Sequence, residues 1–543
     1  MSSGDATPPS STGAVQPEPP SSNSAVRPGT ARRRISAPLS RGGRFARLLA
    51  LLVVVPWTLV ALSSHGPALV SALTGASTGT GRPSAAACAA YRSPGRVPVT
   101  GHQAPGAKLR VFAVGYHLNL DHAASYATWR TAMRCLMEDT VVPHLSPGVP
   151  TLVVFPEDIG LPTIGVGARG AGVRAQAGSP ARAASDAVPL GMAGALAQLN
   201  IAYAPQIAAY QLRFGGLDPR KQAMLAATDT FARAFSRTFS EIARDYGVYV
   251  VAGNNQARYR VSRDPAEVAL FADPALKSTG VAYVATSARV TNSTFLWGPR
   301  DVDAAAPQFE NNLLFRNEKV PLTALELDLL GLDEGPATGP AALANASGVD
   351  VAGFTVGFAT SLPAFAYGYP FGQRPAGFDP CADLRASYAA CQDHLGVDLM
   401  VQADANPGRW ATAAQSGGWQ PLEWMGSTWR AVADPTVGFR YNVTPMMTGN
   451  LFDLVFDGQS AITGRGAQAV PRRYVGTAAA EGTDPAAYGV YAGAKPEFLA
   501  MSPWAAPDGD RAGLAAAAGT LAPGSGSARE DGYAESVIYA DLT

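Results

Sequence analysis

Thr151 to Glu157 read TLVVFPE, a short apolar run that stops at a proline and a carboxylate. A run of this length is typical of a strand buried on both faces. A carboxylate placed directly after it lies at the carboxyl edge of a sheet, where α/β domains build their sites. Apolar neighbours there raise a carboxyl pKa toward the range of a general base. Glu157 alone would be interpreted as a strand-end capping carboxylate, so the surrounding sequence has to decide.

Further strands and helices alternate on both sides of this run. Helical spacing of large apolar residues predicts helices over 123–137, 228–246 and 384–395. Apolar runs predict strands at 109–116, 248–253, 280–290, 293–298, 312–320, 354–360 and 397–404. This order favours a layered α/β domain over a helical bundle or an all-β sandwich.

The composition excludes some functions. The 543 residues carry 42 Lys and Arg against 42 Asp and Glu, so the net charge is zero and electrostatic binding of nucleic acid is not expected. Charged residues make up only 15% and apolar residues 47%, which is enough to build a large core.

The N-terminal part predicts a membrane anchor. Residues 1–43 form a basic, Ser- and Pro-rich tail that we expect to be disordered and cytoplasmic. Residues 44–72 hold an apolar run preceded by arginines, which predicts a transmembrane signal anchor with the rest of the chain outside the cytoplasm. The strictly apolar part, 48–62, is short for a span, so a cleavable signal peptide stays open.

The remaining boundaries follow from composition. Residues 73–106 are predicted to be a linker, 107–475 the folded domain, and 476–543 an Ala- and Gly-rich tail. The four cysteines, Cys88, Cys135, Cys381 and Cys391, lie on the predicted outer side, where disulfides persist. Four cysteines allow three pairings, and the sequence does not choose among them.

A second charged segment follows another expected strand. LLFRNEKVPLTALE at 313–326 places Lys319 at the end of a strand and Glu326 shortly after it. Together with VVFPED, LRVFAVGYHLNLD, EIARDYGVYVVAGNN, VTNSTFLWGPRD and LGVDLMVQADANPGRW, this segment resembles the nitrilase, or carbon-nitrogen hydrolase, superfamily. That superfamily includes amidases and the apolipoprotein N-acyltransferase domain, and the six segments occur in its order.

The resemblance implies a four-layer α-β-β-α fold, pairing with a second copy of the chain, and neither a metal nor an organic cofactor. Residues from about 165 to 225 have no counterpart in the compact family pattern and are predicted to be an insertion, either a lid or membrane-facing arm or an ordinary packed helix. The substrate class implied is an amide, either a small molecule or a lipid-linked group of the cell envelope.

The resemblance also implies roles in a Glu, Lys, Cys triad. Glu157 would be the base, Lys319 would stabilise the oxyanion of the tetrahedral intermediate, and Glu326 would orient the site. The Pro-Phe-Gly that precedes the second glutamate in the family is absent before Glu326.

The nucleophile has two candidate positions. By its place after an expected strand, VGFATSLP puts Ser361 where the family has its cysteine, whereas CADLR puts Cys381 in the local family motif. Ten residues of helix between Cys381 and Cys391 would span about 15 Å, so we expect a free Cys381 thiol.

Two functions therefore remain. One is an extracytoplasmic amide-cleaving or acyl-transferring enzyme that uses Glu157, Lys319 and Cys381. The other is a catalytically degenerate binding or scaffolding module of the same fold, which the Ser361 position implies.

Overall fold

The computed structural model describes residues 81–177, 190–276, 280–408, 420–467, 497–504 and 517–543. The predicted signal anchor and basic tail lie outside these residues. Within them, no helix is both long and apolar enough to cross a membrane.

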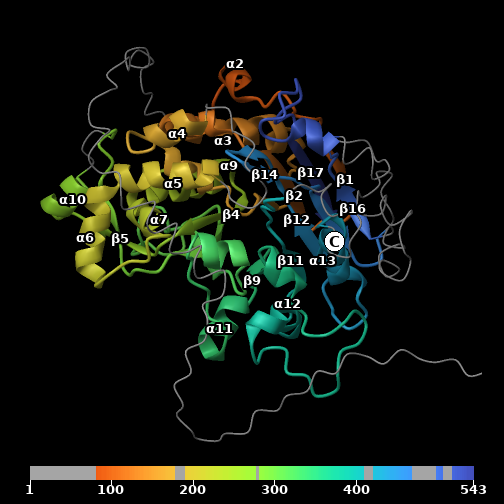
Figure 1. The fold of residues 1–543 in the computed structure, drawn as a ribbon. Coiled ribbons are helices and arrows are strands. Elements are labelled where there is room, and N and C mark those ends of the chain that lie inside the picture. Colours follow the sequence, from red (N-terminus) through yellow and green to blue (C-terminus); the bar gives the residue numbers. More distant parts are fainter. Residues whose placement is uncertain (1–80, 178–189, 277–279, 409–419, 468–496, 505–516) are drawn as a thin grey trace, which may run out of the picture. The chain divides into compact units, whose positions relative to one another are not determined.

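Two β-sheets form the centre of the domain (Figure 1). The larger one has the order β1-β17-β2-β3-β4-β7-β8 and is extended by the β13–β14 hairpin beside β2; the smaller one has the order β16-β15-β12-β11-β10-β9. In each sheet the middle strands β2-β3-β4 and β10-β11-β12 are parallel, so their carboxyl ends share an edge. The strands of the larger sheet are β1 (Thr100–His102), β2 (Leu109–His117), β3 (Thr151–Val154), β4 (Tyr249–Gln256), β7 (Thr291–Trp297), β8 (Leu313–Glu318), β13 (Met447–Leu451), β14 (Leu454–Phe456) and β17 (Ser536–Leu542). Those of the smaller sheet are β9 (Val349–Val351), β10 (Phe354–Phe358), β11 (Leu399–Val401), β12 (Tyr441–Thr444), β15 (Ala461–Gly464) and β16 (Phe498–Met501).

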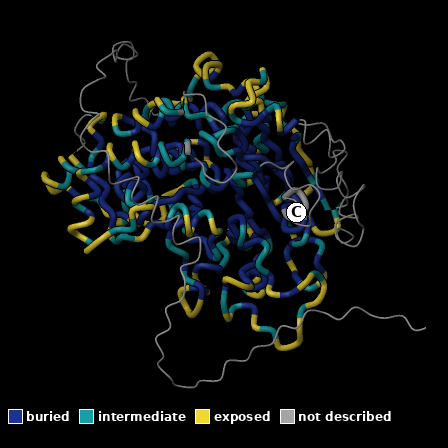
Figure 2. Tube along the Cα trace, in the orientation of Figure 1, coloured by how far each residue is buried: buried dark blue, intermediate teal, exposed yellow. Residues whose placement is uncertain are grey.

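The sheets pack face to face and helices cover their outer faces. Side chains such as Val111 and Val154 of the larger sheet share one core with Val356 and Leu399 of the smaller sheet. The other face of the larger sheet packs on α3 (Tyr126–Leu136) and α9 (Arg237–Tyr246). The other face of the smaller sheet packs on α11 (Gly339–Ala346), α12 (Leu384–His394) and α13 (Gln420–Ala433). The result is an α-β-β-α order of layers, with the strands as the buried part of the domain (Figure 2).

Local sequence signals explain where the expected elements begin and end. The helix predicted over 123–137 is α3, and it begins only after Ser125, whose hydroxyl and backbone form a capping box with Thr128. The strand predicted over 151–157 stops at Val154. Pro156 has no N–H to give a sheet, and Asp158 turns the chain with φ +56°.

The predicted insertion is a group of packed helices. These are α4 (Ala171–Ala177), α5 (Leu190–Ala202), α6 (Ala204–Phe214) and α7 (Gln222–Ala226). Leu199, Tyr203 and Tyr210 from this group share a core with α8 (Thr228–Phe231) and with β6 (Ala282–Ala285), which pairs with β5 (Tyr259–Ser262). Figure 1 shows α5, α6 and α7 side by side.

Both expected domain boundaries need correction. β1 lies in the predicted linker, and β16 and β17 lie in the predicted C-terminal tail. β17 pairs along its whole length with β2 and carries β1 on its other side. Composition misled the prediction because a strand of seven residues is easily hidden in an Ala- and Gly-rich segment.

The cysteines form two disulfides, Cys88–Cys135 and Cys381–Cys391. The expected separation of Cys381 from Cys391 is wrong, because their Cα atoms lie 4.8 Å apart. α12 begins only at Leu384, after Cys381, and the backbone leaves helical geometry again at Ser387. The ten residues therefore do not form one straight helix.

Candidate functional site

Four chain segments reach the same edge of the two sheets. Glu157 follows β3, and Lys319 follows β8, whose carboxyl end pairs with the beginning of β7. In the smaller sheet, Ser361 follows β10 and Asp404 follows the neighbouring parallel strand β11. The backbone N–H of Ala405 donates to Glu157 Oε2 at 3.1 Å and so links the two sheets at this edge.

Glu157, Lys319 and Glu326 form a buried ionic cluster. Lys319 Nζ lies 2.7 Å from Glu157 Oε1 and 2.9 Å from Glu326 Oε2. All three side chains are almost fully excluded from solvent. The structure therefore brings together the three residues for which the sequence predicted adjacent roles.

Asn292 and Thr323 donate further hydrogen bonds to the two carboxylates. Asn292 Nδ2 donates to Glu157 Oε1 and to Glu326 Oε1, both at 2.7 Å. Thr323 donates to Glu326 Oε2 through its backbone N–H and its hydroxyl, both at 2.8 Å. Asn292 lies in one of the segments that carry the resemblance, but it was not predicted as a site residue. It orients both glutamates around a single amide.

The environment separates the pKa values of the two glutamates. Burial, helped by repulsion from Glu326, raises the pKa of Glu157 above its ordinary value. Burial also acts to raise the pKa of Glu326, but Lys319 and the hydrogen bonds from Thr323 and Asn292 outweigh it and leave that pKa lowered. Desolvation opposes the charge on Lys319, yet its two carboxylate neighbours raise its pKa well above the ordinary value. Two carboxylates whose pKa values are shifted in opposite directions are suited to different tasks.

Ser361, one of the two positions predicted for the nucleophile, lies beside this cluster. It is buried and lines the same pocket as Glu157 and Lys319. Its backbone has φ +58° and ψ −114°, an unusual conformation for a residue with a side chain. Strained backbone of this kind gathers where a side chain must be presented in one direction.

Two buried acids close to the ionic cluster, Asp404 and Asp158, were not predicted as site residues. Burial and the charge of Glu157 raise the pKa of Asp404 well above its ordinary value, while a hydrogen bond with Ser361 acts to lower it. Burial and Glu157 likewise raise the pKa of Asp158. A signal for Asp404 existed in the sequence, because VDLMVQAD ends a buried run with a carboxylate as TLVVFPE does.

Cys381 is not part of this constellation, and its candidacy as the nucleophile needs correction. Its sulfur is bonded to Cys391, and it is not among the residues that line the pocket. It precedes α12 and packs against the core on the outer side of the smaller sheet. The CADLR segment therefore matches the family motif in its residues, but it lies away from the pocket. Of the two predicted positions, Ser361 lines the pocket and Cys381 does not.

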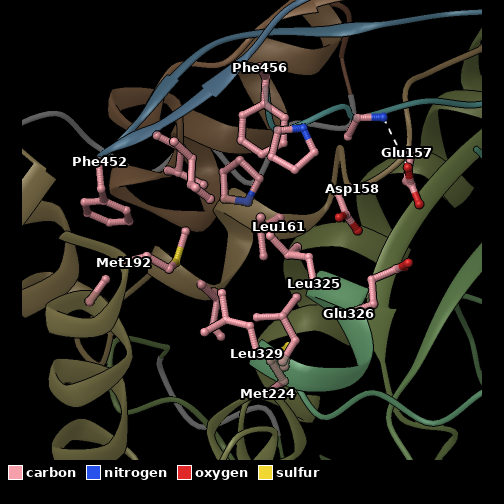
Figure 3. A pocket seen from close by; sticks show the side chains of 18 of the residues that line it. Glu157, Asp158, Leu161, Met192, Met224, Leu325, Glu326, Leu329, Phe452 and Phe456 are labelled. Atoms are coloured by element: carbon pink, nitrogen blue, oxygen red, sulfur yellow. Dashed lines mark hydrogen bonds between the residues drawn. The ribbon is translucent and has the colours of Figure 1, made fainter. Parts of the chain in front are cut away.

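The cluster lies at one end of a cavity of about 140 Å³. Glu157, Asp158 and Glu326 lie at its polar end, and Met192, Leu329 and Phe452 are among the side chains opposite (Figure 3). Met192 belongs to α5, so the insertion supplies part of the wall. A polar reactive end and an apolar body are the usual composition of a small-molecule site.

Comparisons with known proteins give similar folds at low identity. No protein-family model matches the chain, and no curated protein sequence matches it. The similar solved structures include a Cys-to-Ser variant of an amidase from Nesterenkonia AN1 of the nitrilase superfamily, 15% identical over 66% of this chain and 85% of that chain, with a TM-score of 0.32. Another is the amidase from Nesterenkonia sp., 14% identical over 66% and 84% of the two chains, with a TM-score of 0.30. Matches at this level carry no inference about activity, so the function below rests on the site itself.

Proposed function

We propose that this protein is a carbon-nitrogen hydrolase or acyltransferase of the nitrilase type that acts through Ser361. One observation supports this above all: Ser361, Glu157 and Lys319 line a single cavity, with a general base, a cation and a hydroxyl facing the same space. The substrate class that fits this arrangement is a neutral amide.

The reaction follows from the functional groups. The Ser361 oxygen bonds to the amide carbonyl carbon, and its proton passes to Glu157. Two carboxylates face the Lys319 ammonium, which has three N–H groups, so the third is available to the oxyanion. The carbon–nitrogen bond then breaks, and Glu157 returns the proton to the leaving amine. Water, or another acceptor with a hydroxyl or amine, then gives a proton to Glu157 and bonds to the carbonyl carbon of the acyl-serine ester. The bond from that carbon to the Ser361 oxygen breaks, and Glu157 returns the proton to Ser361.

A serine needs more activation than the cysteine of the family. Its hydroxyl is far less acidic than a thiol, so the base and the orientation of the oxygen matter more. Asp404 supplies orientation, because it interacts with Ser361 and is itself held by Gln402, whose Nε2 donates to Asp404 Oδ2 at 3.1 Å.

A second candidate is a binding module that captures the same ligand without turnover. The observation in its favour is the replacement of the thiol itself, combined with the tight ligation of Glu157 by Lys319, Asn292 and Ala405. A base that is held by three donors is a weaker acceptor for the serine proton.

We also propose that the domain works outside the cytoplasm, anchored through residues 44–72. The two disulfides, which use all four cysteines of the chain, support this placement because such bonds persist in oxidising compartments. The arginines before the apolar segment support the orientation.

A serine-directed probe tests the proposed enzyme. The outer domain is treated with ethyl fluorophosphonate, and the adduct is located by intact mass and peptide mapping. We expect one adduct on Ser361, absent in Ser361→Ala and at least tenfold slower to form in Glu157→Gln. A protein that binds simple amides but forms no adduct is the binding module, and one that does neither refutes both functions.

A further inference from the structure

The apolar end of the cavity is built by segments that lie far apart in the sequence. Met192, Leu196 and Leu199 come from α5 in the insertion. Leu325 and Leu329 come from the turn of helix that carries Glu326, and Phe452 from the β13–β14 hairpin. Figure 3 shows Met192, Leu329 and Phe452 on the side away from Glu157 and Asp158, with Leu325 next to Glu326. This wall suits a hydrocarbon group better than water, since water finds no hydrogen-bond partners along it.

The walls are held in place by contacts outside the cavity. The backbone N–H groups of Gly191 and Met192, at the beginning of α5, donate to the carboxylate of Asp453 beside Phe452. α5 also packs on α4 and α7. The insertion is therefore docked against the hairpin as a fixed wall of the cavity.

The size of the cavity limits the occupant. Its volume is about 140 Å³. An engineered protein cavity of roughly 150 Å³ lined by Leu, Ile and Phe holds one benzene molecule, so this cavity, whose volume includes its polar end, takes a hydrocarbon group of at most about six carbons.

The charges at the polar end select the head group. Glu157 and Glu326 share the one ammonium group of Lys319. A carboxylate ligand would meet this excess of acidic groups, whereas a neutral amide carbonyl only needs a hydrogen-bond donor.

We propose that the cavity is an acyl subsite that takes a hydrocarbon chain of up to about six carbons, with the amide carbonyl of the substrate at Ser361 and Lys319. This assignment rests on the proposed function for the position of the carbonyl. It deepens that function by naming the substrates: amides of medium-length aliphatic acids, which the insertion helix α5 selects by chain length.

Binding of simple amides to Ser361→Ala tests the subsite apart from the chemistry. Acetamide, butanamide, hexanamide, octanamide and decanamide are titrated by calorimetry. We expect affinity to rise about threefold to fourfold per methylene up to about six carbons and then to level off. We also expect hexanoate to bind at least tenfold more weakly than hexanamide. A flat series, or a preference for hexanoate, overturns the subsite.

A matched pair of substitutions on α5 locates the chain. Ala195 is buried and lines the cavity, whereas Ala197 is exposed on the same helix. Ala195→Leu should weaken hexanamide binding at least tenfold and leave acetamide unchanged, and Ala197→Leu should change neither. If the two variants bind hexanamide with equal affinity, the hydrocarbon chain does not lie against α5.

The two proposals fail separately. If ethyl fluorophosphonate leaves Ser361 unmodified while the amide series keeps its chain-length dependence, the enzyme is refuted and the subsite stands. If Ser361 reacts but affinity does not depend on chain length, the subsite is refuted and the enzyme stands. If Ala195→Leu fails to fold, the amide series in Ser361→Ala tests the acyl subsite by itself.

Discussion

The carboxylate of Asp453 caps α5 by accepting hydrogen bonds from the N–H groups of Gly191, at 2.8 Å, and Met192, at 3.2 Å. An acid at a helix N-terminus satisfies backbone donors that have no partner within the helix and interacts favourably with the helix dipole. Because Asp453 belongs to the hairpin and α5 to the insertion, this cap joins two walls of the cavity whose bonded residues are 261 and 262 positions apart in the sequence.

Asp453→Ala should therefore damage the cavity more than the fold. Loss of a capping side chain costs about 1 kcal/mol in the free energy of unfolding. We expect a loss of that size in urea unfolding, together with weaker binding of hexanamide. Asp264→Ala is the control, because Asp264 caps α10 (Pro265–Phe271) with bonds to Ala266 and Glu267 and does not line the cavity. Equal binding losses in both variants would contradict a role for the cap in holding the cavity.

The Cys381–Cys391 disulfide should be dispensable for reactivity. In the double variant Cys381→Ser, Cys391→Ser we expect the same fluorophosphonate adduct on Ser361, because neither cysteine lines the cavity. Removing a disulfide should still lower the free energy of unfolding, by about 2 to 4 kcal/mol. The matched control removes Cys88–Cys135, which closes a longer loop of 47 residues. Loss of the Ser361 adduct in a folded Cys381, Cys391 variant would return Cys381 to consideration.

Those parts of the fold that depend on local pattern could be predicted. The buried run before Glu157 and the spacing of the α3 helix follow from apolar periodicity, which a sequence displays directly. β17 could not be predicted in the same way. Its place between β1 and β2 depends on pairing over more than four hundred residues, which no local pattern carries.

The same distinction explains the site. Glu157 and Lys319 each end an apparent strand, and the sequence paired them correctly. Cys381 was favoured by its neighbours in the chain, but the start of α12 and the break at Ser387 place its sulfur against Cys391. Asp404 was passed over although it also follows a buried run, because its partner Ser361 comes from another segment.

Formation of the acyl enzyme should depend on pH through Glu157. The base acts when deprotonated, so the rate rises as pH increases through its pKa, and burial places that pKa above the ordinary 4.5. Glu326→Gln removes a negative charge that raises this pKa, so the rising limb should move to lower pH. The rate of adduct formation on Ser361, measured from pH 4 to 8, checks the shift. Glu334→Gln is the control, because Glu334 pairs with Arg385. It should leave the pH dependence of the rate unchanged. If Glu326→Gln also leaves the pH dependence unchanged, Glu157 is not the base.

Ser361→Gly should make the protein more stable while abolishing its reaction with the probe. Ser361 holds φ +58°, a conformation that costs a residue with a side chain about 1 to 3 kcal/mol and that glycine adopts freely. Glycine also gains freedom in the unfolded chain, so we expect a net increase of about 1 kcal/mol in the free energy of unfolding. Ser361→Ala should lose the adduct without that gain, because its Cβ keeps the strain.

Ala352→Gly is the matched control for backbone strain outside the site. Ala352 has φ +55° in the turn between β9 and β10 and does not line the cavity. This variant should gain stability as Ser361→Gly does and keep the full Ser361 adduct. If Ser361→Gly is instead no more stable than Ser361→Ala, the backbone at Ser361 is unstrained. The serine would then be held in place by its neighbours alone and not by a conformation maintained at the expense of stability.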